Sequence, residues 1–227
     1  MSLQFIMGNS GSGKSYCLYD TVVREAIENP DKNYLVIVPE QFTMQTQKDL
    51  CLAHPKGGIM NIDVLSFGRL AYRVFEEVGQ DARVVLDDEG KNLVLRKIAG
   101  ECEKDLKVFK GNLKKQGYIS EVKSVLSEFA QYGVDFERLD DFMKEVPPES
   151  YLHYKLDDIR TIYEKFEEYL SEKYITKEEM LDVLSDAVPY SDILKGSVVA
   201  MDGFTGFTPV QNRLIGELFS VCEKVMI

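Results

Sequence analysis

A glycine-rich loop near the start of the chain restricts the possible folds more than any other feature. Its residues match the pattern G-x-x-x-x-G-K-[ST], and they are Gly8, Asn9, Ser10, Gly11, Ser12, Gly13, Lys14 and Ser15. An apolar run at 3–7 precedes the loop, and residues 16–27 carry apolar side chains at helical spacing. The loop therefore joins a predicted strand to a predicted helix, where backbone N–H groups can close around phosphate oxygens.

Two side chains of this loop have predicted roles in binding a nucleotide such as ATP. Lys14 is expected to reach the β- and γ-phosphates, and the hydroxyl of Ser15 is expected to ligate Mg²⁺. The alternative is a glycine-rich turn that contains a lysine by chance. The flanking strand and helix favour phosphate binding over that alternative.

The composition is typical of a globular protein from a reducing compartment. No run of apolar residues among the 227 is long enough to cross a bilayer, and the first predicted strand leaves no room for a signal peptide. The four cysteines are scattered without a C-x-x-C pair, which favours free thiols over disulfides or a zinc site. We therefore expect a cytoplasmic location without membrane association. A net charge of −11 argues against binding a polyanion over the whole surface.

Strands and helices alternate in the first third of the chain. Strand-like apolar runs at 33–38 and 59–65 are each followed by a helical pattern, at 41–53 and 67–78. The order β-α-β-α-β-α predicts an α/β fold with a doubly wound parallel sheet.

Helical patterns then follow one another from 84 to 189, before a strand pattern returns at 197–201 and a helix at 209–221. The sequence therefore predicts an α/β domain formed by residues 1–83 and 190–227. An all-helical subdomain, residues 84–189, is expected to be inserted into it. The final residues resemble the start of another strand, so we expect an N-terminal fragment of a longer protein.

A phosphate-binding loop also needs an acidic residue at the end of a neighbouring strand to hold the Mg²⁺ shell. Asp202 directly follows the strand pattern at 198–201 and fits this role. Asp63 is a weaker candidate because its predicted strand continues beyond it. A purely structural role for Asp202, as the cap of a turn, stays open.

A phosphate-binding domain with a helical insertion between its two nucleotide motifs is the layout of superfamily 1 helicases. Helicases that resemble UvrD carry Asp-Glu-Phe-Gln-Asp-Thr-x-Pro after the second motif's strand, and residues 202–209 here read Asp-Gly-Phe-Thr-Gly-Phe-Thr-Pro. Gly203 thus replaces the catalytic Glu, and Thr205 replaces the Gln. Together with the glycine-rich loop and the segments 38–43 and 65–71, this pattern resembles the N-terminal region of the AddB family.

That resemblance implies a function in DNA repair. Members of the family belong to heterodimeric AddAB helicase–nucleases of Gram-positive bacteria, are related to RexB, and process double-strand DNA ends. The implied partners are an AddA-type subunit and DNA, and the implied cofactors are ATP and Mg²⁺. The nuclease domain and its iron–sulfur cluster are expected in a C-terminal part outside this chain. Since Gly203 cannot act as a base, we expect little or no ATP hydrolysis.

Three residues are candidates for DNA contact by the same resemblance, namely Gln41, Arg69 and Arg73. Two other functions stay open at this point. A small-molecule P-loop kinase would explain the glycine-rich loop, but no arginine lid is evident. An interaction scaffold with a vestigial nucleotide site would need no further motif.

Overall fold

The computed structural model describes residues 2–79, 83–113, 115–171 and 173–227. The chain forms two compact units, one comprising Met1–Asp81 with Leu181–Ile227 and the other Ala82–Met180. The chain returns from the second unit to the first inside helix α8 (Glu179–Ala187). This position lies before the boundary expected at residue 189. No helix in the described ranges combines the length and apolar character required to span a bilayer.

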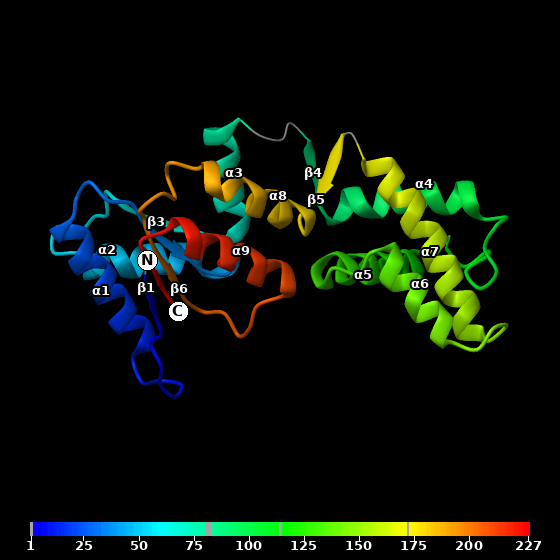
Figure 1. Cartoon of the computed structure of the whole chain (residues 1–227), viewed down its shortest axis with the longest axis horizontal. Coiled ribbons are helices and arrows are strands. Elements are labelled where there is room, and N and C mark those ends of the chain that lie inside the picture. Colours follow the sequence, from blue (N-terminus) through cyan, green and yellow to red (C-terminus); the bar gives the residue numbers. More distant parts are fainter. Residues whose placement is uncertain (1, 80–82, 114, 172) are drawn as a thin grey trace. The chain divides into compact units, whose positions relative to one another are not determined.

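A five-stranded sheet forms the centre of the first unit (Figure 1). Its strand order is β1-β7-β6-β2-β3, and each neighbouring pair is parallel. The strands are β1 (Ser2–Gln4), β7 (Lys224–Met226), β6 (Val198–Met201), β2 (Tyr34–Ile37) and β3 (Ile62–Leu65). Because all pairs are parallel, the carboxyl ends of the strands lie at one edge of the sheet, where polar loop residues can converge. The predicted α/β class with a parallel sheet is confirmed.

The two central strands are apolar and buried along their whole length. Every residue of β2 and β6 is buried, as expected for strands covered on both faces. Ile37 lies opposite Leu65 on one side and Met201 on the other. This register places the ends of three strands side by side.

Helices α1 (Lys14–Glu28), α2 (Thr43–Ala53), α3 (Phe67–Val78) and α9 (Pro209–Val221) follow strands of this sheet, with a 3₁₀ turn at Glu40–Phe42 and another at Val188–Tyr190. Helix α1 packs apolar side chains spaced by three and four residues into the core, namely Leu18, Val22, Val23 and Ala26. The helix starts follow local rules. Ser66 caps α3 by accepting from the N–H of Arg69, and Thr208 forms a capping box with Gln211 at the start of α9.

The second unit is built from α4 (Asp88–Cys102), α5 (Gln116–Tyr132), α6 (Phe136–Glu145) and α7 (Tyr151–Leu170). These helices enclose a separate apolar core that includes Leu95, Ile98, Ile162 and Phe166. The prediction that this segment is all-helical is wrong in one respect. Strands β4 (Val84–Leu86) and β5 (Tyr174–Thr176) form a two-stranded parallel sheet. Each strand has only three residues, too few to reveal alternation, and their pairing joins parts of the chain far apart in sequence.

Asp158 is a buried acidic residue that holds a loop of the second unit. It is 1% exposed, on α7. Its carboxylate accepts hydrogen bonds from the backbone N–H groups of Lys107, Val108 and Phe109 at 2.7–2.8 Å. A charged acceptor with three N–H donors offsets the cost of burying the carboxylate, because hydrogen bonds to charged groups are stronger than neutral ones.

Replacing this carboxylate tests that account. Asp158→Ala leaves three N–H groups without their acceptor and should lower the free energy of unfolding by on the order of 3 kcal/mol. Its neighbour provides the control, since Asp157 pairs with Lys107 at 3.0 Å with both side chains at least 40% exposed. Asp157→Ala should cost less than about 1 kcal/mol. Urea unfolding of both variants checks the difference, and equal losses would contradict the role given to Asp158.

Candidate functional site

The glycine-rich loop connects β1 to α1 at the carboxyl edge of the sheet. Gly11 and Gly13 have φ values of 77° and 83°, in the left-handed region that favours glycine. Gly13 is the N-cap of α1, so the helix begins at Lys14. The left-handed turns explain why the predicted loop requires glycine at these two positions.

Unpaired backbone N–H groups surround the start of α1. Within the described part of the chain, no hydrogen bond is made by the N–H groups of Gly11, Gly13, Lys14 or Ser15. Helix N-termini carry partial positive charge and leave their first N–H groups free for an anion. The loop can therefore hold a phosphate group through its backbone.

The side chain of Lys14 lies across the same loop. Its ammonium donates to the carbonyl oxygens of Gly8 at 2.9 Å and Asn9 at 2.8 Å. These contacts keep the positive charge beside the free N–H groups. The same ammonium could bind a phosphate oxygen of a nucleotide, since Lys has three donors.

Ser15 and Asp202 are 187 positions apart in sequence and form a hydrogen bond at the loop. The hydroxyl of Ser15 donates to Oδ1 of Asp202 at 3.0 Å. Asp202 directly follows β6, whose pairing with β2 carries it to this edge. The weaker candidate, Asp63, lies on β3 and pairs instead with Arg73 at 2.6 Å. Of the two acidic candidates, the fold brings Asp202 to the loop, where it could hold Mg²⁺ through the metal's water shell.

Two further polar side chains join this cluster, and neither was singled out from the sequence. Tyr19 of α1 donates from its hydroxyl to Oδ2 of Asp202 at 2.7 Å. Thr46 of α2 lies 3.2 Å from the same hydroxyl. The spacing of Tyr19 from Ser15, i to i+4 on a helix, was the one available sequence signal. Nothing in the sequence near Thr46 indicates that α2 reaches the loop.

Gly203 lies where helicases that resemble UvrD carry a catalytic Glu. Its φ is 78°, and a Cβ atom there would lie 3.4 Å from the Phe42 ring and 3.5 Å from the Pro39 ring. A side chain at this position is strained by the backbone conformation whatever its chemistry. The turn after Asp202 is thus shaped around a residue without a side chain, and no carboxylate follows Asp202 there.

A pocket of about 150 Å³ opens beside the loop. Its lining includes Lys14, Asp202, Phe204 and Phe207, and the two phenylalanine rings pack at 5.1 Å between centroids. Sites for drug-sized ligands usually measure roughly 300–1,000 Å³. This pocket is smaller than that, and most of its lining is apolar, so it adjoins the loop and does not enclose a whole nucleotide.

The three DNA-contact candidates differ in their surroundings. Gln41 is exposed in the 3₁₀ turn after β2, and Arg69 is exposed on α3. The guanidinium of Arg73 is held by Asp63. Gln41 and Arg69 are therefore free to meet a ligand, whereas Arg73 would first have to leave its carboxylate.

Comparison with known proteins identifies the family. The family model described as "ADDB, N-terminal" matches residues 5–227. The chain belongs to the AddB family. Its relatives include proteins named as the B subunit of an ATP-dependent helicase/deoxyribonuclease. Over its whole length the chain is 47% identical to the one from Lachnoclostridium phytofermentans, 37% to that of Clostridium tetani and 36% to that of Alkaliphilus metalliredigens. It spans about a fifth of the length of each of these relatives.

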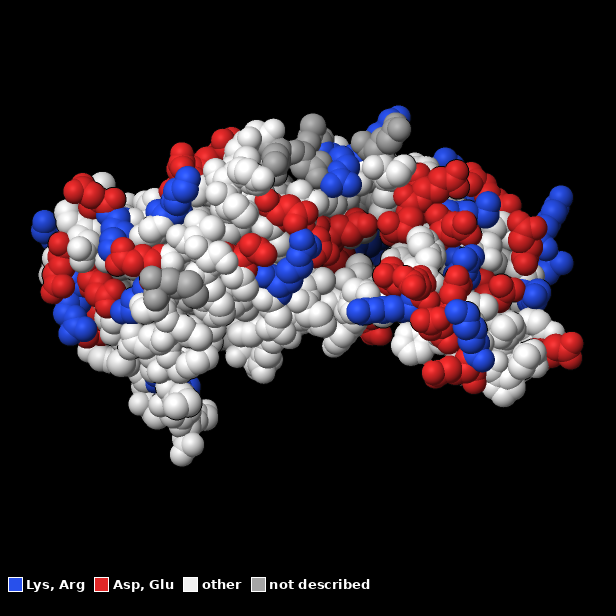
Figure 2. Space-filling model, viewed as in Figure 1, with Lys and Arg blue, Asp and Glu red and all other residues white. Residues whose placement is uncertain are grey.

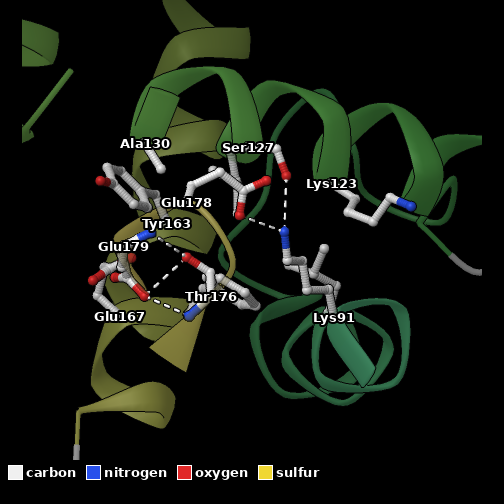
Figure 3. Close-up of a pocket in the computed structure, with 12 residues that line it drawn as sticks. Lys91, Lys123, Ser127, Ala130, Tyr163, Glu167, Thr176, Glu178 and Glu179 are labelled. Atoms are coloured by element: carbon white, nitrogen blue, oxygen red, sulfur yellow. Dashed lines mark hydrogen bonds and ion pairs between the residues drawn. The ribbon is translucent and has the colours of Figure 1, made fainter. Parts of the chain in front are cut away.

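A second polar cluster of this AddB-family chain lies in its helical unit (Figure 3). Lys91 is 3% exposed and donates to Glu178 at 2.7 Å and to Ser127 at 3.2 Å. The buried ammonium is thus paired and hydrogen-bonded, which is the condition for tolerating such a charge. Because these groups satisfy one another, they form an internal network that joins α4, α5 and the segment before α8.

Glu167 and Glu179 lie on another side of the same cluster (Figure 3). Glu179 accepts from the N–H and hydroxyl of Thr176, and its own N–H donates to that hydroxyl, which is the reciprocal pattern of a capping box. Burial, together with the negative charge of Glu179, raises the pKa of Glu167 to about 7. Near neutral pH, part of the Glu167 population is therefore protonated, whereas an exposed glutamate is ionised.

The raised pKa of Glu167 predicts how stability depends on pH. Between its ordinary pKa of 4.5 and about 7, the folded chain holds a proton that the unfolded chain has released, so rising pH favours unfolding. Glu167→Gln should remove this dependence. The unfolding free energy of the variant minus that of wild type should therefore increase by about 2–3 kcal/mol from pH 5 to pH 8. Glu168→Gln, on the exposed neighbour, should leave the dependence unchanged. Urea unfolding at both pH values measures it, and parallel profiles for wild type and Glu167→Gln would contradict the assignment.

Proposed function

We propose that this chain is a Mg-nucleotide- and DNA-binding, helicase-like module of an ATP-dependent helicase/deoxyribonuclease, with a P-loop NTPase fold and little or no ATP hydrolysis. The observation that carries the proposal is the grouping of Lys14, Ser15 and Asp202 at one helix N-terminus. The free N–H groups of the loop supply the remaining donors for phosphate. When bound, Mg²⁺ would neutralise phosphate charge, with Ser15 and Asp202 as the residues that hold it.

Family membership supports the setting of this module. Its relatives are named as one subunit of an ATP-dependent helicase/deoxyribonuclease. We infer that the parent protein pairs with an AddA-type subunit in the cytoplasm and processes double-strand DNA ends for recombinational repair. These relatives are not small-molecule kinases by name, which disfavours that alternative. A scaffold with a vestigial site differs from the proposal by binding no nucleotide.

Binding of DNA to this chain alone should be weak. On the face shown in Figure 2, acidic side chains cover much of the helical unit 82–180, with lysines and arginines between them. Together with the net charge of −11, they repel the phosphate backbone. We therefore expect Gln41 and Arg69 to make only local contacts with DNA. Most of the positive charge that attracts the DNA backbone would come from the partner subunit.

The nucleotide proposal predicts a large effect of Lys14. Lys14→Ala removes the ammonium from the loop and should weaken binding of Mg-ATP by about 2 kcal/mol, or roughly thirtyfold. Lys48, exposed on α2, offers a matched control because Lys48→Ala removes the same charge elsewhere. Isothermal titration calorimetry measures both affinities. Equal affinities of wild type and Lys14→Ala for Mg-ATP would contradict the proposal. If none of the three proteins binds Mg-ATP, the result would favour the scaffold with a vestigial site.

The second expectation concerns turnover. Phosphate release by the wild-type chain should not exceed that of Lys14→Ala, with or without single-stranded DNA, because no base follows Asp202. Gly203→Glu should not restore activity, since the left-handed backbone at this position strains any side chain. A phosphate-release assay on the three proteins provides the test. Robust DNA-stimulated release by wild type would instead identify an active ATPase.

A further inference from the structure

The side chain of Tyr19 holds one oxygen of the candidate metal-binding carboxylate. Tyr19 follows Ser15 by four residues on α1, so both side chains project from the same face of the helix. Ser15 donates to Oδ1 of Asp202 at 3.0 Å, and Tyr19 donates to Oδ2 at 2.7 Å. Each oxygen of the carboxylate is therefore held by a different hydroxyl of one helix.

The carboxylate of Asp202 determines the direction of the hydrogen bonds made by Tyr19 and Thr46. An ionised carboxylate only accepts, so the single proton of the Tyr19 hydroxyl goes to Asp202. The contact of 3.2 Å between Tyr19 and Thr46 must then have Thr46 as its donor. Thr46 is 4% exposed on α2 and cannot exchange this partner freely for water. The result is a directed chain, Thr46 to Tyr19 to Asp202, in which each hydrogen bond polarises the next.

A tyrosine hydroxyl carries its proton near neutral pH, because its ordinary pKa is about 10. A short hydrogen bond from a neutral donor to a carboxylate is charge-assisted and fixes the plane of that carboxylate.

This arrangement leaves acceptor positions of the Asp202 carboxylate free for a metal ion's water shell. A carboxylate has about four lone-pair positions, and Ser15 and Tyr19 use two of them. The remaining two can accept from metal-bound water. The hydroxyl of Ser15 could also offer a lone pair to the metal while its O–H still donates to Asp202. Neither hydrogen bond has to break when the site fills.

We propose that Tyr19 is a positioning residue for Mg²⁺ at the nucleotide site, acting through Asp202 and itself held by Thr46. This inference rests on the proposed nucleotide function. Its consequence is selective: loss of the Tyr19 hydroxyl lets the carboxylate turn but leaves the loop N–H groups and Lys14 in place. Binding that depends on metal should therefore suffer, and metal-free binding should not.

The test separates the two kinds of binding. ATP is titrated calorimetrically into the 227-residue chain with excess Mg²⁺ and again with EDTA. Tyr19→Phe should bind ATP about tenfold more weakly in Mg²⁺, as expected for loss of an outer-shell partner, and change less than about twofold in EDTA. Thr46→Val keeps the shape of the side chain and should also weaken ATP binding in Mg²⁺, but by less than Tyr19→Phe does. Thr46→Ser restores the hydroxyl and should bind like wild type.

Tyr16→Phe is the matched control, because Tyr16 is 76% exposed on the same helix and its hydroxyl does not contact Asp202. Three results would each overturn the inference. Tyr19→Phe could bind ATP in Mg²⁺ as tightly as wild type does, or more tightly, or it could lose the same affinity for ATP in Mg²⁺ and in EDTA. The last result would assign Tyr19 a purely structural role. If the wild-type chain binds no ATP under either condition, the proposed nucleotide function fails and the inference fails with it.

Discussion

The parallel pairing of β6 with its two neighbours, β2 and β7, is the interaction on which the candidate site depends. Strand β6 lies beyond the whole helical unit in sequence, and it joins Val198–Met201 to Tyr34–Ile37 on one side and to Lys224–Met226 on the other. Because β7 also pairs with β1, the strand that leads into the loop, the sheet fixes Asp202 relative to Lys14 and Ser15. The pairing is stabilised by burial of apolar side chains on both faces of the two central strands, and burial of this kind is the main favourable term in folding. Polar residues at the edge of the sheet are thus positioned by the apolar residues of its centre.

Features that depend on neighbours in sequence could be predicted before the structure. The glycine-rich loop, the strand at 33–38 and the helix at 209–221 follow from spacing and from local hydrogen bonds. The Thr176–Glu179 capping box belongs to the same class, because its two partners lie within one helical turn.

Features that depend on contacts between distant segments could not be predicted. The β4–β5 pairing, the Lys91–Glu178 ion pair and the contact of Thr46 with Tyr19 each join residues that no local pattern relates. Asp158 likewise resembles any acidic residue of an exposed helix until its loop packs over it. The candidate metal-binding residue Asp202 could be predicted from the sequence, because a strand pattern ends directly before it. Its partner Tyr19 was not, since an aromatic residue on an apolar helix face ordinarily belongs to the core.

The short β4–β5 sheet has a consequence for the way this chain can fold. Val84 lies opposite Tyr174, so the two ends of the helical unit are one strand spacing apart once that unit has formed. Closing a long loop costs entropy that grows with its length. A helical unit that folds on its own core first therefore replaces a long flexible loop between β3 and β6 by a short connection. The β4–β5 pairing thereby lowers the entropic cost of bringing β6 to β2 in the central sheet. It also means that a short linker could replace the helical unit.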